Sequence, residues 1–191
     1  MLLTGSQAMA LGAMASGLKF YSGYPMSPAT TVMEFISSQA DKYNIAFEQA
    51  EDEIAAINMV IGASFAGTRA MTATSGGGFC LMVEALSLAG MTETPAVIIV
   101  AQRPGPSTGL PTRTEQADFN LVMHAGHGDF PRAVLAPGHP QQALYLMSKA
   151  FNLADRYQTP VIVLGDQHFG DAYFTVDELD LGGITIDRGH I

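Results

Sequence analysis

The chain has 191 residues, a formal net charge of −9 and one cysteine, Cys80. The excess of acidic side chains argues against a protein that neutralises nucleic-acid phosphates, and a single cysteine excludes an internal disulfide or a four-cysteine metal cluster built from this chain alone. No apolar run reaches the ~18 residues of a membrane span, and the N-terminus lacks the pattern of a secretory signal. We therefore predict a cytoplasmic protein that contacts neither nucleic acid nor membrane.

Short β-rich runs alternate with helical patterns, as in consecutive βαβ units. The predicted strands are 20–23, 45–47, 69–74, 96–101, 133–135 and 161–164, and the predicted helices are 6–15, 28–40, 52–66, 78–89 and 140–156. Strands 96–101 and 161–164 are apolar on both faces, which is typical of a parallel sheet covered on each side. The sequence thus predicts an α/β fold with a doubly wound, mostly parallel sheet and helices on both faces. We expect this domain at 1–175, followed at 176–191 by a linker or the start of a further domain.

Polar motifs follow several of these strands, where open α/β sheets bind ligands. After the first strand comes Tyr-Pro-Met-Ser-Pro at 24–28, in which Ser27 reads as a helix N-cap before Pro28, as His139 does before Pro140. Capping could be the whole role of Ser27. After strand 96–101 comes Arg103, whose guanidinium suits a substrate carboxylate, although a salt bridge to an acidic side chain is the alternative. The long segment 103–129 that follows is rich in proline and glycine, which favours a functional loop.

Two further motifs lie at helix starts. Glu51 and Asp52 complement the positive end of a helix dipole, whereas Glu53 flanks a predicted buried stripe of Ile54, Ile57 and Ile61. A partly desolvated carboxyl group at Glu53 is suited to acid–base catalysis. The alternative is that Glu53, like Glu51 and Asp52, is a solvated acidic residue without a catalytic role. The segment 72–79 runs from an apolar strand into three glycines, which let a ligand approach the backbone, but it matches no complete phosphate-binding fingerprint. His124, His127 and Asp129 are not expected to bind a metal, because glycines interrupt any regular ligand helix.

Four segments in this order resemble the alpha subunit of 2-oxoacid:ferredoxin oxidoreductases: 23–28, 51–58, 71–78 and 102–112. The resemblance runs from about Thr4 to Gly170. It implies a domain that binds the aminopyrimidine ring of thiamine diphosphate, with the diphosphate, magnesium and an iron–sulfur cluster on a beta subunit. The complex would be a dimer or heterotetramer that uses a 2-oxoacid, coenzyme A and ferredoxin.

The resemblance also implies roles for individual residues. Glu53 would be catalytic, activating the cofactor through the ring nitrogen of the pyrimidine, and Ser27 and Arg103 would bind the substrate. The implied cofactor contacts are Tyr24, Pro25, Ser27, Ser75, Gly76 and Gly77. Two departures from the family pattern are Ser-Gly-Gly-Gly for Ser-Gly-Pro-Gly and Met26-Ser27 for Ile-Thr. The diphosphate motif of thiamine enzymes has no full match, since Gly-Asp-Gln at 165–167 differs from Gly-Asp-Gly at its third position, and this absence fits a diphosphate bound by the beta subunit.

The segment 106–112 favours 2-oxoglutarate as the substrate, with pyruvate and branched-chain 2-oxoacids left open. Because the family continues into further domains, we expect this chain to be truncated or a split subunit. Two other hypotheses stand beside the enzyme subunit. One is an assembly or docking domain that keeps the fold without the chemistry, and the other is an unrelated nucleotide-binding α/β domain.

Overall fold

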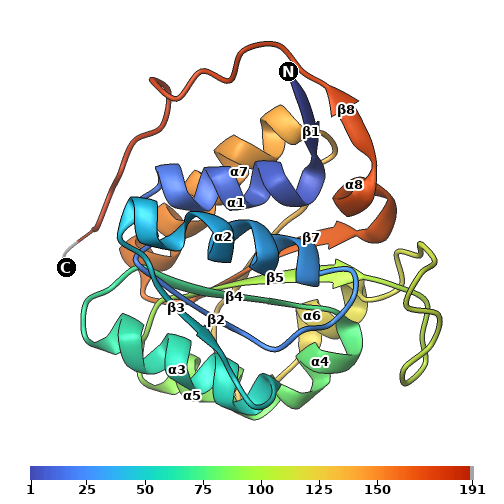
Figure 1. The fold of residues 1–191 in the computed structure, drawn as a ribbon. Helices are drawn as coiled ribbons and strands as arrows, with labels where there is room; N and C mark the ends of the chain where they lie inside the picture. Colours follow the sequence, from blue (N-terminus) through green and yellow to red (C-terminus); the bar gives the residue numbers. More distant parts are fainter. Residues whose placement is uncertain (190–191) are drawn as a thin grey trace.

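A computed structural model describes residues 1–189 and has a six-stranded parallel sheet at its centre (Figure 1). The strand order is β3-β2-β4-β5-β7-β6. The strands are β2 (Phe20–Gly23), β3 (Ala46–Gln49), β4 (Ala70–Thr74), β5 (Ala96–Gln102), β6 (Ala133–Leu135) and β7 (Pro160–Asp166). Every pairing between neighbours in this sheet is parallel, which confirms the predicted doubly wound fold.

Helices cover both faces of the sheet. They are α1 (Gly5–Ala15), α2 (Thr30–Tyr43), α3 (Glu53–Phe65), α4 (Gly76–Leu81), α5 (Val83–Met91), α6 (Phe119–His124), α7 (Pro140–Tyr157) and α8 (Gln167–Asp171). In Figure 1, α1, α2 and α7 lie on one face, and α3, α4, α5 and α6 lie on the other. Each layer buries its apolar side chains against the sheet in a separate core cluster. The central strands β5 and β7 are buried over almost their whole length, as their two-sided apolar pattern indicated.

The structure corrects several predicted elements. The helix predicted at 78–89 is two helices, because the chain turns at Met82 and buries that side chain in the core cluster beneath α4 and α5. Helices α6 and α8 were missed, since each is short. The strands β1 (Leu2–Thr4) and β8 (Tyr173–Thr175) were also missed, because they pair antiparallel with each other from opposite ends of the chain.

The two predicted caps have opposite outcomes. His139 is the N-cap of α7 with Pro140 in the first turn, and its Nδ1 accepts a hydrogen bond from the Gln142 N–H at 3.2 Å. The cap prediction for Ser27 is wrong, because α2 begins at Thr30 after a turn and its N-cap residue, Ala29, has no side-chain acceptor. The exposed Ser27 instead contributes its backbone carbonyl to a contact described below.

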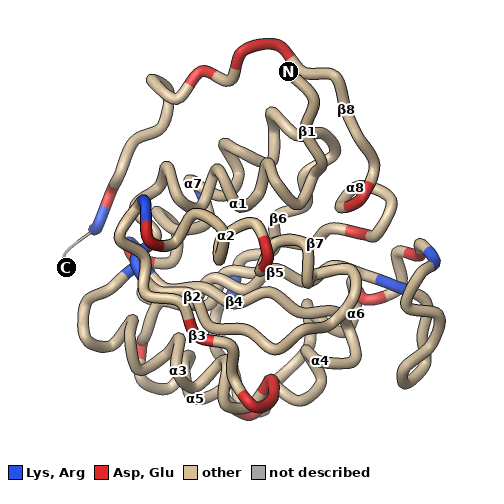
Figure 2. The backbone as a smooth tube through the Cα atoms, in the orientation of Figure 1, with Lys and Arg blue, Asp and Glu red and all other residues tan. Residues whose placement is uncertain are grey.

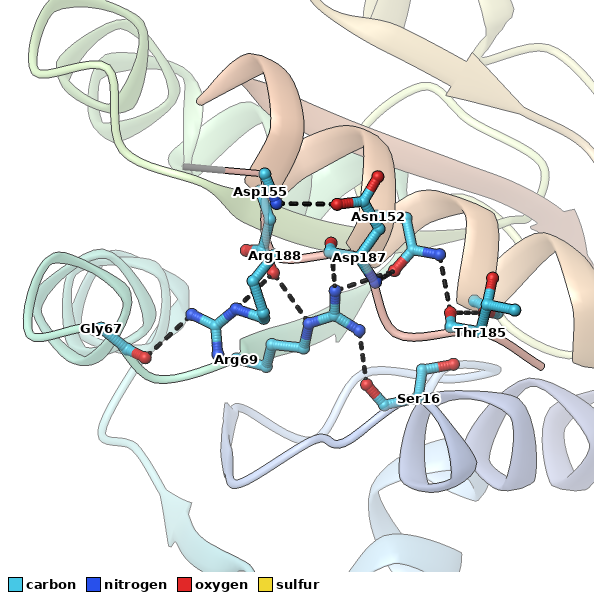
Figure 3. A network of polar contacts seen from close by, with 10 residues as sticks. Ser16, Gly67, Arg69, Asn152, Asp155, Thr185, Asp187 and Arg188 are labelled. Atoms are coloured by element: carbon cyan, nitrogen blue, oxygen red, sulfur yellow. Dashed lines mark hydrogen bonds and ion pairs between the residues drawn. The ribbon is translucent and has the colours of Figure 1, made fainter. Parts of the chain in front are cut away.

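The segment after β8 returns along α7 to the amino edge of the sheet, where a polar cluster holds it (Figure 3). Buried Arg69, immediately before β4, forms an ion pair from Nε to Oδ2 of Asp155 on α7 at 2.8 Å. Arg69 also donates to the backbone carbonyl of Asp187, and Arg188 pairs with the same Asp155 oxygen at 2.8 Å. Residues 190 and 191 of the predicted linker lie outside the described residues.

The sheet topology indicates where a ligand would bind. From β2 the chain passes outward to β3 and then returns to the other side of β2 as β4. The connections after β2 and β3 therefore diverge onto opposite faces, and open α/β sheets bind ligands at such a point, beyond the carboxyl ends of the strands. Among residues 1–189, no helix has the length and apolar character to cross a membrane.

Candidate active site

The carboxyl ends of β2, β4 and β5 bring the sequence motifs to one edge of the sheet. The segment 24–28 follows β2, the segment 75–78 follows β4, and Arg103 follows β5. Glu53 begins α3, which packs against β2 and β4. The parallel register thus gathers four separate stretches of sequence at the topological switch point.

Glu53 is held at the first position of α3 by its neighbour. Asp52 is the N-cap residue, and its Oδ1 accepts a hydrogen bond from the Ala55 N–H at 2.7 Å. Glu53 itself is 3% exposed, and its Oε1 has no hydrogen-bond partner within residues 1–189. The prediction that Ile54 belongs to the buried stripe is wrong, since Ile54 is 50% exposed. Glu53 takes a place in that stripe, because its spacing to Ile57 is one helical turn.

The glycine segment after β4 lies directly against this carboxyl. A Cβ atom at Gly78 would lie 2.7 Å from Oε1 of Glu53 and closer still to Oγ1 of Thr74. A Cβ at Gly77 would meet one atom, the Ser107 carbonyl oxygen, at 3.5 Å, which is ordinary contact. The departure from Ser-Gly-Pro-Gly therefore falls at the exposed position of the three. The N-cap residue Ser75 is fully buried, and its hydroxyl has no partner among the described residues.

Asp118 is a second carboxyl at this turn, and no sequence signal singled it out. It lies at the end of the proline-rich loop after β5, just before α6. Its carboxyl oxygens would be 2.4 and 2.5 Å from a Cβ on Gly76. Burial, and secondarily the charge of Glu115, raises the pKa of Asp118 above its usual range. The sequence predicts that the long loop is functional. It does not predict which residue of the loop returns to the edge of the sheet, because that depends on the path of the loop.

Arg103 is 9% exposed and donates from Nη1 to the Ser27 carbonyl oxygen at 2.6 Å. Within residues 1–189 it forms no salt bridge, so the alternative of an acidic partner is not observed. In the same β2–α2 loop, Met26 was not proposed as a site residue, yet its sulfur lies 3.8 Å from Oγ1 of Thr74. Tyr24 and Pro25 are exposed at the rim.

Charge is unevenly distributed around the site. Figure 2 marks acidic residues in red along the end of β3 and the turn into α3. Exposed Glu48 and Glu51 lie there beside the half-buried Asp52. No group of three or more histidine, cysteine or acidic residues within 1–189 has the arrangement to hold a metal ion.

Comparison with known proteins assigns the family. The family model for the thiamine diphosphate-binding domain of pyruvate flavodoxin/ferredoxin oxidoreductases matches residues 11–188. The chain belongs to this family. It is 46% identical to the alpha subunit of 2-oxoacid:ferredoxin oxidoreductase 1 from Sulfurisphaera tokodaii, covering 99% of this chain and 32% of that protein. It is 44% identical to the 2-oxoglutarate synthase subunit KorA of Archaeoglobus fulgidus, covering 96% of this chain and 53% of the relative.

A solved structure of the same family shares the fold. The 2-oxoglutarate:ferredoxin oxidoreductase from Magnetococcus marinus, with 2-oxoglutarate, coenzyme A and succinyl-CoA bound, superposes with a TM-score of 0.95 at 44% identity. The match covers 98% of this chain and 33% of that one. This chain therefore spans about a third of that protein and of the Sulfurisphaera relative, and about half of the Archaeoglobus one.

The residues gathered at this edge of the sheet fit an aminopyrimidine ring. Such a ring requires a hydrogen-bonding partner for a ring nitrogen and a flat backbone surface beside it. Glu53 supplies a buried carboxyl oxygen with no partner among the described residues, and a buried polar atom without a partner is uncommon in folded proteins. The side-chain-free segment at 76–78 supplies the flat surface.

Proposed function

We propose that this domain contributes the aminopyrimidine side of a thiamine diphosphate site in the alpha subunit of a 2-oxoacid:ferredoxin oxidoreductase. The observation that carries the proposal is the buried Oε1 of Glu53, which has no partner within residues 1–189. Leaving such an oxygen unpaired costs roughly 1–3 kcal/mol. A ring nitrogen bound at this position would remove that cost by hydrogen bonding to Glu53.

Thiamine diphosphate, when bound, supplies a carbon nucleophile for 2-oxo carbonyl groups. Glu53 holds a hydrogen bond to the ring nitrogen and so controls the protonation of the amino group on the same ring. Ser75, Gly76 and Gly77 present backbone and hydroxyl groups to the cofactor from one side. Tyr24, Pro25 and Ser27 border it from the β2–α2 loop.

Arg103 binds the carboxylate of the substrate, together with Ser27. Arg103 is buried and uses Nη1 for the Ser27 carbonyl oxygen. Donors that remain on the planar group match the geometry of a carboxylate. We propose 2-oxoglutarate as the substrate, because a relative is named a 2-oxoglutarate synthase subunit and the similar solved enzyme holds 2-oxoglutarate.

A beta subunit completes the site and carries the diphosphate, magnesium and iron–sulfur cluster, with coenzyme A and ferredoxin as the other reactants. The exposed apolar side chains at the ends of α3 and α5 support a protein partner on this side of the domain. Phe65 is 77% exposed and Met91 is 85% exposed, and α3 has no charged residue other than the buried Glu53. An exposed apolar surface with so little charge is typical of an interface.

The test is coenzyme A-dependent reduction of a viologen dye by the full alpha subunit co-expressed with its beta partner. Glu53→Gln is expected to lower kcat about 100- to 10,000-fold for the best 2-oxoacid, because acid–base catalysis contributes on this scale. Glu51→Gln is the matched control, since Glu51 is an exposed carboxyl two residues away, and it should keep wild-type activity.

A second readout separates the enzyme subunit from an assembly domain. Added thiamine diphosphate should raise the melting temperature of the wild-type complex, and it should raise that of the Glu53→Gln complex less. A Glu53→Gln complex with the wild-type rate and the wild-type thermal protection would remove Glu53 from the site. An assembled wild-type complex that neither binds the cofactor nor turns over any 2-oxoacid would favour the assembly role.

A further inference from the structure

Asp118 and Glu53 flank the same turn from different sides. Asp118 packs on the Cα of Gly76, and Glu53 packs on the Cα of Gly78. Successive residues of an α-helix are rotated by about 100°, so positions 76 and 78 face nearly opposite directions. The first turn of α4 is therefore held between two carboxyl side chains.

Asp118 is itself attached to the sheet. Its backbone N–H donates to Oε1 of Gln102 at 2.9 Å, and Nε2 of the same Gln102 donates to the Gly165 carbonyl oxygen at 3.2 Å. Gln102 is buried at the end of β5. A path of contacts thus runs from β7 through the buried side-chain amide of Gln102 to the backbone of Asp118, and the carboxyl group of Asp118 continues it to Gly76.

An aspartate at position 118 destabilises the folded protein more than an apolar side chain of similar size would. Its Oδ2 is buried and has no hydrogen-bond partner among residues 1–189, and Glu115 adds a second negative charge nearby. An unpaired buried acceptor costs roughly 1–3 kcal/mol, which an apolar side chain would avoid. Contact with the first turn of α4, which lies against Glu53, is a reason for an aspartate at this position despite that cost.

We propose that Asp118 is a positioning residue of the cofactor site, which holds the first turn of α4 against Glu53 by packing on Gly76. The inference rests on the proposed function for its consequence, because the turn is the backbone surface offered to the pyrimidine. Asp118 touches neither the cofactor nor the substrate. It sets where Gly76, Gly77 and Gly78 lie.

Hydrogen exchange in the full protein without added cofactor tests this directly. Asp118→Ala removes the packing on Gly76, and amides of 76–82 should exchange about tenfold faster or more, while amides of β5 keep their protection. Asp118→Asn has nearly the same shape and should restore wild-type exchange. Asp171→Ala is the matched control, because Asp171 is another partly desolvated carboxyl but lies on α8.

A second measurement links the turn to the ligand. The concentration of thiamine diphosphate that half-saturates the complex should rise about tenfold in Asp118→Ala and return to near wild type in Asp118→Asn. Wild-type exchange and wild-type half-saturation in Asp118→Ala would overturn the proposal, as would an Asn variant as defective as the Ala variant. If the wild type bound no thiamine diphosphate, the proposed function would fail, yet the exchange result would still decide the role of Asp118 at the turn.

Discussion

Nη1 of Arg103 donates to the backbone carbonyl oxygen of Ser27 at 2.6 Å, which joins the end of β5 to the loop after β2 across the intervening strand β4. The contact uses the backbone of Ser27, and the side chain of Ser27 stays exposed. One planar cation therefore orders the β2–α2 loop and remains able to donate elsewhere.

We expect Arg103→Lys to raise KM for the 2-oxoacid about 10- to 100-fold, because lysine lacks the planar fork and a hydrogen bond to a charged group contributes ~1.5–3 kcal/mol. Steady-state kinetics over a range of 2-oxoacid concentrations measures this. Arg113→Lys is the control, since exposed Arg113 bonds the carbonyl of its neighbour Thr112. Equal KM values for the two variants would contradict a carboxylate-binding role for Arg103.

Alanine substitutions at the adjacent positions Gly77 and Gly78 should differ strongly in their effect on stability. Gly78→Ala places a methyl group against Thr74 and Glu53, and overpacking of this kind costs typically ~1–3 kcal/mol. We expect a lower denaturant midpoint and loss of cofactor binding. Gly77→Ala, which has room for the added methyl group, should keep the denaturant midpoint of the wild type. A Gly78→Ala protein with wild-type stability and binding would show that the turn tolerates a side chain beside Glu53.

The polar cluster at the amino edge of the sheet predicts a large loss of stability. Arg69 is buried with Asp155, and removing one partner of such a pair costs about 3–5 kcal/mol. In a chain of this size, Arg69→Met should lower the melting temperature by roughly 10 °C. Arg156→Met is the control, because its pair with Asp187 is exposed and spans 3.7 Å. Melting of both variants within about 2 °C of the wild type would mean that the cluster contributes little.

Asp118 predicts a pH dependence of stability. Burial raises the pKa of Asp118 in the folded protein above the usual 3.8. At a pH between these two pKa values, the folded protein therefore holds a proton that the unfolded chain has lost. The free energy of unfolding should therefore fall as the pH rises from 3.8 through the folded pKa, and this penalty persists at neutral pH. Asp118→Asn cannot titrate there.

Urea unfolding of the wild type and Asp118→Asn at pH 4 and pH 7 measures this effect. The stability of the Asn variant relative to the wild type should be greater at pH 7 than at pH 4. The reverse trend would mean that the folded state prefers the ionised form of Asp118.

From the amino-acid sequence we could predict the alternation of strands and helices, the parallel sheet and the approximate place of each motif at a strand end. These features are local, because apolar runs, glycines and capping residues act within a few positions of one another. The burial of Glu53 was predicted in this way, since an acidic residue at a helix start beside an isoleucine repeat is visible without a structure, and its catalytic role stays a prediction.

Features that depend on contacts between distant parts of the chain became visible only in the folded structure. The pairing of Leu2 with Thr175, the exposure of Ile54 and the use of the Ser27 carbonyl in place of its hydroxyl are all of this kind. Asp118 is the clearest case. Its approach to Gly76 requires a loop to leave β5 and return to the end of β4, and no local pattern encodes where such a loop closes, because closure depends on the packing of the strands that it joins.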